Sequence, residues 1–394
     1  MDRRHHRARD LLGHGRPTGK GQMNKTEELA ASLGIDGEWL RAMQAVPRET
    51  FVPDVGLACP EEGPSYPIDR QARPDEWLRA VYSDASIITQ REGGKGDPLQ
   101  ISDGMASSSL SAPSIAFKCL ELLAPRDQDR VLEIGAGTGY TAAVLSARVG
   151  EKNVTTIEVD AGIAKRAEAN LAESGFSPNV VVGDGRAGFP DNAPYDRVHA
   201  TAAVAEIPFT WVEQTRPGGV IVAPWQPLRD HGLLTRLTTT SDGAYGRFHG
   251  PAGYMMLRSH RAQLRWRVHH DEEAEVTTTA LDPRTVFEAG PGLRLATVAL
   301  SPGLVFWEKH FDDGSFSLLL FEIGDPDGPW AACDWEPGDD RYEVTQYGDR
   351  LLWDELEDAF EWWVRHDGPG VHRFGLTVTP EGDKLWLDEP TRLV

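Results

Sequence analysis

Short apolar runs alternate with longer amphipathic stretches through the middle of the chain. A run of four to six apolar residues predicts a buried strand, and apolar residues three and four positions apart predict a helix. The expected strands are residues 131–134, 154–159, 180–182, 196–200, 218–223, 232–240 and 254–258. The expected helices are residues 140–148, 163–173 and, in mixed form, 204–215. This alternation predicts an α/β protein with a parallel sheet covered on both faces.

The chain before this region is less regular. Residues 25–45 and 114–123 have helical patterns. Residues 59–108 are rich in Pro, Gly, Asp and Ser and have few periodic positions. A loop of that length inside a compact domain is usually functional or mobile, so we expect it near a site.

The chain after this region has shorter elements. Asp-Gly and Pro-Gly turns separate expected strands at residues 295–300, 315–321 and 376–379. Residues 351–365 predict one amphipathic helix. We therefore expect a small C-terminal α+β domain. Most of its seven tryptophans should be core, although one or two could instead line a peptide-docking groove.

The length of 394 residues suits two domains. We expect a disordered lead at residues 1–22, a first domain at 23–260 and an acidic, tryptophan-rich domain at 261–394. The lead lacks the apolar core of a signal peptide, and no apolar run approaches a membrane span. The three cysteines have no metal or disulfide spacing. These features predict a cytoplasmic protein with no metal site and no membrane partner.

The net charge of −21 is concentrated at the C-terminal end. Residues 271–394 hold 28 Asp and Glu against 9 Lys and Arg, a net charge of −19. An acidic surface repels phosphate backbones, so no nucleic-acid partner is expected. The acidity either suits a basic peptide or protein or simply maintains solubility.

The most informative stretch is the glycine-rich turn that runs from Glu133 to Gly139, between an expected strand and an expected helix. Glycine has no Cβ and tolerates positive φ, so a ligand can approach the backbone closely there. About twenty residues further on, the second strand ends near Glu158. Its carboxylate is placed to accept hydrogen bonds from the ribose of an adenosine cofactor. The alternative is a tight turn in an α/β protein that binds no cofactor.

The residues of this turn help to choose the cofactor. Dinucleotide-binding folds use G-x-G-x-x-G and hold a pyrophosphate at a helix N-terminus. Here the pattern is Glu-x-Gly-x-Gly-x-Gly, and Glu133 would repel a phosphate. S-adenosyl-L-methionine (SAM) has no phosphate, and its methionine ammonium can pair with an acid. The turn therefore predicts SAM.

Seven motifs, taken in their order and spacing, resemble the protein L-isoaspartyl (D-aspartyl) O-methyltransferase family. They are Arg48-Glu49-x-Phe51-Val52-Pro53, Tyr82-Ser83-Asp84, Leu110-Ser111-Ala112-Pro113, Val131-Leu132-Glu133-Ile134-Gly135, Gly183-Asp184-Gly185-Arg186, Ala193-Pro194-Tyr195-Asp196 and Pro217-Gly218-Gly219. The resemblance covers roughly residues 48–258. It implies a Rossmann-like SAM-dependent methyltransferase fold with a seven-stranded sheet.

The resemblance also implies roles for individual residues. Ser111 falls on the family's active-site serine. The implied substrate-binding residues are Asp84, Ser109 and Leu110. The implied cofactor-binding residues are Glu133, Gly135, Gly137, Thr138, Gly139, Glu158, Val159, Asp184 and Gly185, with the last two near the adenine.

Two chemical considerations accompany these roles. A hydroxyl beside a helix N-terminus can help to hold a carboxylate, but a serine before a proline is also a common helix cap, so both roles remain open for Ser111. Methyl transfer to an ionised carboxylate needs little acid–base help. We therefore expect His199 to end a buried strand without a catalytic role.

Three departures from the family pattern concern the substrate. The stretch from Gly104 to Ser111 is one residue longer than the usual Gly-x-Gln-x-Thr-Ile-Ser and lacks its Gln. The connection from Asp84 to Ser111 is also long, and repair enzymes do not need the acidic tail. These departures resemble the branch that methylates an Asp side chain in a constrained, ribosomally made peptide, leading to aspartimide or isoaspartate.

We therefore expect a peptide substrate, a modified precursor peptide, for a SAM-dependent carboxyl O-methyltransferase. Three alternatives remain open at this point. They are repair of L-isoaspartate in damaged proteins, methylation of a small-molecule acid, and a SAM-binding interaction protein without turnover.

Overall fold

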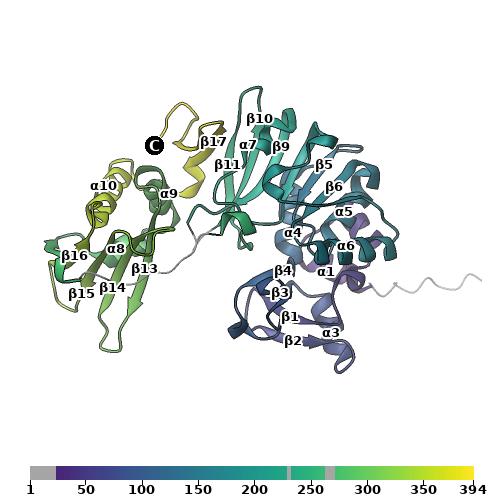
Figure 1. Ribbon diagram of the computed structural model, residues 1–394, viewed down its shortest axis with the longest axis horizontal. Helices are drawn as coiled ribbons and strands as arrows, with labels where there is room; N and C mark the ends of the chain where they lie inside the picture. Colours follow the sequence, from purple (N-terminus) through teal and green to yellow (C-terminus); the bar gives the residue numbers. More distant parts are fainter. Residues whose placement is uncertain (1–23, 229–231, 262–270) are drawn as a thin grey trace, which may run out of the picture.

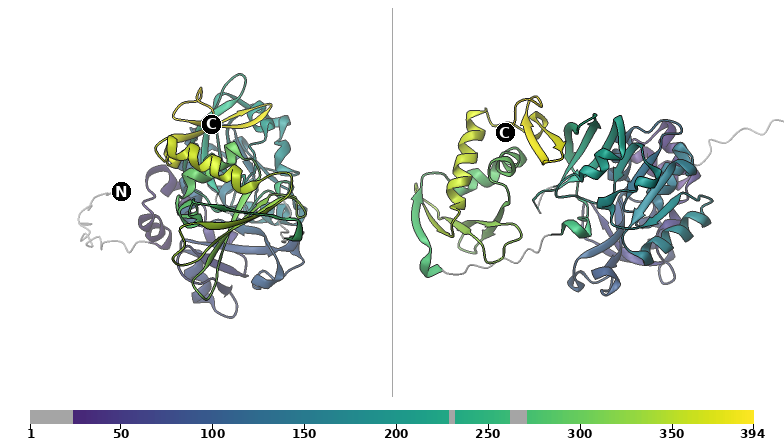
Figure 2. Two further views of the ribbon diagram at one scale, coloured as in Figure 1. Left: turned by 90° about the vertical axis from the view of Figure 1, so that its left-hand side faces the viewer. Right: turned by 45° about the horizontal axis from the view of Figure 1, so that its top comes forward.

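The computed structural model describes residues 24–228, 232–261 and 271–394, which form three β-sheets (Figure 1). A nine-stranded mixed sheet is the centre of the molecule. A four-stranded antiparallel sheet from the N-terminal part packs beside it, and a five-stranded antiparallel sheet forms a separate lobe. The final hairpin of the chain lies between the two lobes (Figure 2).

The nine-stranded sheet has the order β18-β17-β11-β10-β9-β8-β5-β6-β7. Strands β7, β6, β5, β8 and β9 are parallel, and the remaining strands are antiparallel. The first seven strands in chain order are β5 (Val131–Ile134), β6 (Val154–Glu158), β7 (Asn179–Val182), β8 (Tyr195–Ala200), β9 (Thr215–Trp225), β10 (Leu233–Thr239) and β11 (Ala244–Pro251). The expected Rossmann-like sheet is confirmed.

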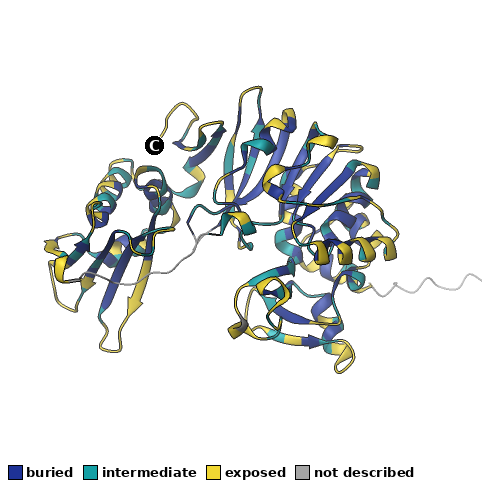
Figure 3. Ribbon diagram, viewed as in Figure 1, coloured by how far each residue is buried: buried dark blue, intermediate teal, exposed yellow. Residues whose placement is uncertain are grey.

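Helices cover both faces of this sheet, as the alternating pattern predicts. Helices α4 (Pro113–Leu123) and α5 (Tyr140–Val149) pack on one face, where Phe117 and Leu145 are buried. Helix α7 (Phe209–Glu213) packs on the other face through Trp211. Helix α6 (Ala161–Glu173) follows β6 and contacts β6 and β7. The strands between these layers are largely buried (Figure 3).

The expected seventh strand is wrong in position. Residues 254–258 do not form a strand, and the closing strand is β11. Only Ala244 and Phe248 of β11 are buried, so its apolar pattern is too sparse to predict a strand.

Two further strands extend the sheet beyond β11. Strand β17 (Phe374–Thr379) pairs antiparallel with β11, and β18 (Gly382–Leu387) pairs with β17. Phe374 and Leu376 are 0% exposed, so this hairpin belongs to the core of the main sheet. The expected boundary at residue 260 therefore does not separate the sheets, because the last strands of the chain return to the first domain.

The expected long loop at residues 59–108 is wrong. This part of the chain contributes to a four-stranded sheet around buried Ile68 and Ile87, and residues 92–105 connect two of its strands. Its strands are too short for their alternation to stand out from the surrounding Pro and Gly. Together with the two helices that precede it, the N-terminal part contains α1 (Lys25–Ser32), α2 (Gly37–Ala45), β1 (Val55–Pro60), β2 (Tyr66–Asp69), α3 (Pro74–Val81), β3 (Ala85–Arg91) and β4 (Ala106–Leu110).

The second lobe contains the five-stranded sheet and three helices. Its elements are β12 (Glu275–Thr279), α8 (Pro283–Glu288), α9 (Pro291–Leu300), β13 (Leu304–His310), β14 (Phe316–Glu322), β15 (Trp330–Trp335), β16 (Tyr342–Tyr347) and α10 (Leu352–Arg365). The expected helix at 351–365 is confirmed. The expected strand at 295–300 is wrong, because Pro291 begins a helix that buries Leu293, Ala296 and Thr297 at helical spacing.

Burial varies among the tryptophans of the C-terminal part. Trp330, Trp353 and Trp386 are 2–3% exposed, whereas Trp307 is 55% exposed. Most of the side-chain area of the first three therefore belongs to the core. Among the described residues, no helix has both the length and the apolar character needed to cross a membrane.

Candidate functional site

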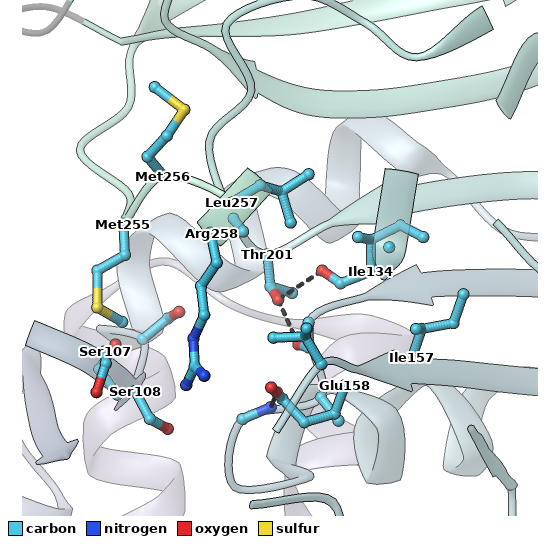
Figure 4. Close-up of a pocket in the computed structure, with 18 of the residues that line it drawn as sticks. Ser107, Ser108, Ile134, Ile157, Glu158, Thr201, Met255, Met256, Leu257 and Arg258 are labelled. Atoms are coloured by element: carbon cyan, nitrogen blue, oxygen red, sulfur yellow. Dashed lines mark hydrogen bonds between the residues drawn. The ribbon is translucent and has the colours of Figure 1, made fainter. Parts of the chain in front are cut away.

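A cleft opens at the carboxyl ends of β5, β6 and β8 (Figure 4). The strand order reverses at β5, and ligands of open α/β sheets bind at such a point. The lining segments are residues 107–111, 134–138, 157–159, 184–185, 201–202 and 255–259, together with Tyr140, Thr141 and Arg261. Ten of the expected site residues lie in this lining, namely Ser109, Leu110, Ser111, Gly135, Gly137, Thr138, Glu158, Val159, Asp184 and Gly185.

Two glycines form the floor of the cleft because no larger residue fits. Gly135 has φ +97°, and a Cβ there would lie 2.6 Å from Oγ1 of Thr201. Gly137 has φ +53°, and a Cβ there would lie 3.0 Å from the carbonyl oxygen of Ser109. The backbone at these positions is therefore open to a ligand.

Gly139 has a different role. It does not line the cleft, and a Cβ there would meet Leu171 and Ala167 of α6 at 3.2–3.4 Å. This glycine lets α5 approach α6 closely. The expected cofactor contact at Gly139 is not present in the geometry, because its open side faces a helix.

Glu158 is the acid at the end of β6. Its Oε2 accepts a hydrogen bond from the Gly137 amide at 3.0 Å, and its Oε1 accepts one from the Asp160 amide at 3.1 Å. Burial raises the pKa of this carboxyl, although both hydrogen bonds and nearby Arg258 oppose the shift. Each oxygen keeps a further lone pair for a ligand hydroxyl.

Arg258 spans the cleft opposite Glu158 (Figure 4). Its Nη2 donates to Oδ2 of Asp160 at 3.1 Å and to Oε1 of Gln90 at 3.4 Å. Gln90 in turn accepts a hydrogen bond from Ser107 at 2.8 Å. This polar network joins the segment after β11 to the four-stranded sheet and to the end of β6.

Asp184 and Gly185 close one end of the cleft. Asp184 accepts hydrogen bonds from the Arg186 amide at 3.0 Å and from the Ser259 hydroxyl at 3.2 Å. A Cβ at Gly185 would collide with the side chain of Ile134. Glycine is therefore needed where this turn crosses β5.

Glu133 lies beneath the glycine turn and does not line the cleft. It is 0% exposed, and Thr156 donates to its Oε2 at 2.6 Å. Its Oε1 has no hydrogen-bond partner within the described part of the chain. Burial raises its pKa to about 8, so at neutral pH the carboxyl is largely protonated. The expected direct pairing of Glu133 with the cofactor ammonium is therefore not present in this geometry.

Ser111 lies in the loop before α4. The N-cap residue of α4 is Ala112, and no side chain of that residue caps the helix. Instead Asp84 accepts a hydrogen bond from the Ser114 amide at 2.9 Å. Asp84 thus stabilises the start of α4 from outside the cleft and does not line it. Ser111 is free of a capping role, and its side chain interacts with the buried Tyr254 hydroxyl.

Arg48 holds the backbone at this position. Its Nη2 donates to the Ser111 carbonyl at 3.1 Å, and its Nε donates to the Val81 carbonyl at 3.0 Å. The guanidinium lies 4.9 Å from the Tyr140 ring centroid, and burial lowers its pKa. Arg48, which belongs to the first of the seven family motifs, therefore holds the backbone at Ser111 in place.

Sequence reasoning missed one wall of the cleft. Residues 255–259 line it, with Met255 pointing toward Ser107 in Figure 4. The apolar run at 254–257 predicts a strand, yet this segment crosses the cleft as irregular backbone joined to Ala203 by a parallel bridge at Met256. Thr201 had no motif of its own, although its position just after β8 could have indicated it.

His199 lies on β8 and is 0% exposed. Burial lowers its pKa to about 4, so it is neutral in the folded protein at ordinary pH. It does not line the cleft.

The residues that line the cleft fit SAM. The two glycines provide a cradle that a Cβ would fill, and Glu158 provides acceptors for a ribose. Two acidic side chains, Glu158 and Asp184, also line the cleft. Together with the parallel sheet, this arrangement defines a SAM-dependent methyltransferase of Rossmann-like fold.

Comparison with known proteins identifies the family. The model of the protein-L-isoaspartate(D-aspartate) O-methyltransferase family matches residues 75–249. A protein-L-isoaspartate O-methyltransferase of Methylorubrum extorquens is 36% identical over 236 residues, which is 60% of this chain and 86% of that protein. One of Methanoculleus marisnigri is 44% identical over 214 residues, 54% of this chain and 80% of that protein. The chain belongs to the protein-L-isoaspartate O-methyltransferase family, and it is a SAM-dependent O-methyltransferase whose cofactor is S-adenosyl-L-methionine.

A solved structure supports the fold over nearly the whole chain. A protein-L-isoaspartate O-methyltransferase superposes with a TM-score of 0.53 and 22% identity, covering 92% of this chain and 100% of that one. The structural likeness therefore includes much of the C-terminal part as well as the methyltransferase sheet.

Proposed function

We propose that this enzyme transfers the methyl group of SAM to a carboxylate of an L-isoaspartyl residue in a protein or peptide. Relatives that carry this activity in their names share 36–44% identity over most of their length. The observation that carries the proposal is a single cleft that combines the glycine cradle with Ser111. The carboxylate oxygen forms a bond to the methyl carbon as the carbon–sulfur bond breaks, giving a methyl ester and S-adenosylhomocysteine.

The proposed roles follow the positions in the cleft. When bound, SAM supplies an electrophilic methyl group on a positively charged sulfur. We assign Glu158 to the ribose hydroxyls, Gly135 and Gly137 to the methionine end, and Asp184–Gly185 to the adenine. Glu133 and Gly139 support the glycine turn and are assigned no contact with SAM. Glu133 is held by Thr156 beneath the turn, and Gly139 packs on α6.

Ser111, Ser109 and Leu110 are the proposed contacts to the acceptor. The carboxylate is already ionised, so no general base is required. The residues of the cleft accelerate the reaction by holding the acceptor in line and by excluding water. Arg258 and the methionines at 255 and 256 form the opposite wall.

A second candidate acceptor is a normal Asp side chain in a constrained, ribosomally made peptide. The resulting ester would be attacked by the following backbone nitrogen, which expels methanol and closes an aspartimide. The connection between β3 and β4 favours it. In that connection Arg91 donates to the Gly104 carbonyl at 2.8 Å, and the Gly93 amide donates to Ser107 at 3.0 Å. This ordered loop adjoins the cleft wall at Ser107, where it would contact a folded substrate.

The C-terminal lobe is weaker evidence than the β3–β4 connection for choosing between the two acceptors. A solved isoaspartate methyltransferase aligns with 92% of this chain, so a C-terminal extension is compatible with the family's named activity. We propose that the acidic lobe, whose sheet runs from β12 to β16, contacts the protein or peptide substrate away from the cleft. Nucleic acid remains an unfavourable partner for so acidic a surface.

Product mass distinguishes the acceptors. The full chain is incubated with SAM and, in separate reactions, with an isoaspartyl peptide, its normal Asp counterpart and a macrocyclic peptide that contains Asp. A gain of one methyl on the isoaspartyl peptide alone supports the first candidate. Methyl gain followed by methanol loss on the macrocycle alone supports the second. Absence of transfer to every peptide, with SAM binding retained, would overturn both.

A further inference from the structure

Asp383 lies near the start of β18, far from the glycine turn in sequence. Its Oδ2 accepts a hydrogen bond from the Trp225 indole Nε1 at 2.7 Å and another from the Ile207 amide at 3.1 Å. Its other oxygen, Oδ1, is shielded from solvent and has no hydrogen-bond partner among the described residues. Burial raises the pKa of this carboxyl to about 6 against the effect of the two hydrogen bonds. A shielded carboxyl is costly, so its position needs an explanation.

One donor, Ile207, belongs to the loop that follows β8, and the other, Trp225, belongs to the neighbouring strand β9. Ile207 lies near the end of this loop, and Trp225 ends β9. Between them, the Val204 amide donates to the Pro224 carbonyl at 2.9 Å, and the Gln226 amide donates to the Val204 carbonyl at 2.7 Å. Asp383 therefore joins the far end of the loop to the strand on which the loop rests.

The same loop forms and supports walls of the cleft. Thr201 and Ala202 line the cleft directly. Ala203 holds the opposite wall, because its amide donates to the Met255 carbonyl at 2.8 Å and its carbonyl accepts from the Leu257 amide at 2.8 Å. A displacement of residues 203–207 would therefore move both walls.

We infer that Asp383 is a positioning residue for methyl transfer, which makes the C-terminal hairpin part of the catalytic unit. The hairpin reaches the site by extending the main sheet past β11, and Asp383 then fixes the loop after β8 through Ile207 and Trp225. The five-stranded lobe is inserted between β11 and β17. The chain thus leaves the methyltransferase sheet, builds the lobe, and returns to complete the support of the cleft.

The convergence of both hydrogen bonds on one oxygen makes a sharp test possible. Asp383→Asn can place its amide oxygen where Oδ2 lies and accept both bonds. Asp383→Ala removes the oxygen that accepts both bonds and so leaves the Ile207 amide and the Trp225 indole without this partner. Lys384→Ala changes an exposed neighbour on the same strand and is the matched control.

The experiment measures binding of S-adenosylhomocysteine by calorimetry and the thermal unfolding of each full-length variant without ligand. Cofactor binding does not depend on which acceptor is correct, so its outcome is independent of the proposed substrate. For a folded Asp383→Ala we expect Kd to rise about tenfold, since small displacements at a site are costly. Asp383→Asn and Lys384→Ala should stay within about twofold of the wild type.

Activity with whichever peptide is methylated adds a second readout. A positioning role predicts that Asp383→Ala raises KM for SAM, and that Asp383→Asn restores it. An unchanged Kd and KM in a folded Asp383→Ala protein would overturn the inference. If Asp383→Ala does not fold, Trp225→Phe decides, because it keeps a smaller aromatic ring at this position and removes one donor. A rise in Kd supports the positioning role, and an unchanged Kd refutes it.

Discussion

The Gly137 amide donates a hydrogen bond of 3.0 Å to Oε2 of Glu158, which ties the glycine turn after β5 to the end of β6. These residues are 21 positions apart in the chain and adjoin the same cleft. The bond orients the carboxylate over the turn before any ligand binds. The turn and the acid therefore form one preorganised unit.

Replacing Glu158 with Ala should weaken SAM binding. The variant loses the acceptors proposed for the ribose and the contact that holds the turn. A hydrogen bond to a charged group contributes about 1.5–3 kcal/mol, so Kd should rise roughly ten- to a hundredfold. Calorimetric titration with S-adenosylhomocysteine measures the change, and Glu168→Ala on the exposed face of α6 is the control. An unchanged Kd would remove Glu158 from the cofactor site.

Replacing Ser111 with Ala should lower turnover and leave cofactor binding nearly intact. Ser111 does not cap α4, so the substitution removes a hydroxyl from the cleft without loosening the helix. We expect kcat to fall roughly ten- to a hundredfold, as for the loss of a hydrogen bond to a charged group. Steady-state kinetics and calorimetry together test this, with Ser32→Ala on α1 as a distant control. Collapse of SAM binding in the Ser111 variant would instead mark a role toward the cofactor.

The buried carboxyl of Glu133 should make stability depend on pH. Its pKa is about 8 in the folded protein against 4.5 when exposed, so the folded state holds a proton that the unfolded state releases. Stability from this group is fully present below pH 4.5 and is lost progressively as pH rises from 4.5 through 8. Between pH 7 and 9 the loss should be roughly 1 kcal/mol.

Glu133→Gln removes this titration, so the difference in Tm between pH 7 and pH 9 should be smaller for the variant than for the wild type. Thermal unfolding without cofactor at both pH values makes the comparison. Equal Tm differences for the two proteins would show that Glu133 is not the titrating group.

Truncation of the chain after residue 270 should destabilise the methyltransferase sheet itself. The cut removes β17 and β18, including Leu376 and Leu385, and leaves β11 as an open edge. Each buried aliphatic side chain contributes roughly 2 kcal/mol, so several kcal/mol are lost. A chain ending at Gly370 keeps the lobe but lacks the hairpin, and it should show the same loss. A shortened chain that melted like the full-length protein would contradict this account.

The methyltransferase core could be predicted from the sequence because its signals are local. The apolar runs at β5 and β6, with a glycine turn and an acid directly after them, place Gly135, Gly137 and Glu158 at one edge of a parallel sheet. Residue spacing sets that geometry whatever the rest of the chain does. Helix α10 was predictable for the same reason, since its stripe of apolar residues is continuous.

Other features depend on contacts between distant segments. Glu133 follows an apolar run and precedes the glycines, but only packing decides that its carboxyl lies beneath the turn. Asp84 has no local mark of a helix cap, because the Ser114 amide that it accepts from is 30 residues away. The run at residues 254–257 is apolar like a strand, and its pairing with Ala203 decides its course.

The sequence by itself determined the Rossmann-like core, the cofactor and the family, because these depend on residues close together in the chain. The tertiary structure decided which residues face the cleft, and it placed the C-terminal hairpin in the main sheet. Asp383 lies 158 residues from Trp225 and 176 from Ile207. No periodicity or motif encodes such a contact, since its energy comes from burial and hydrogen bonds that exist only after the chain has folded.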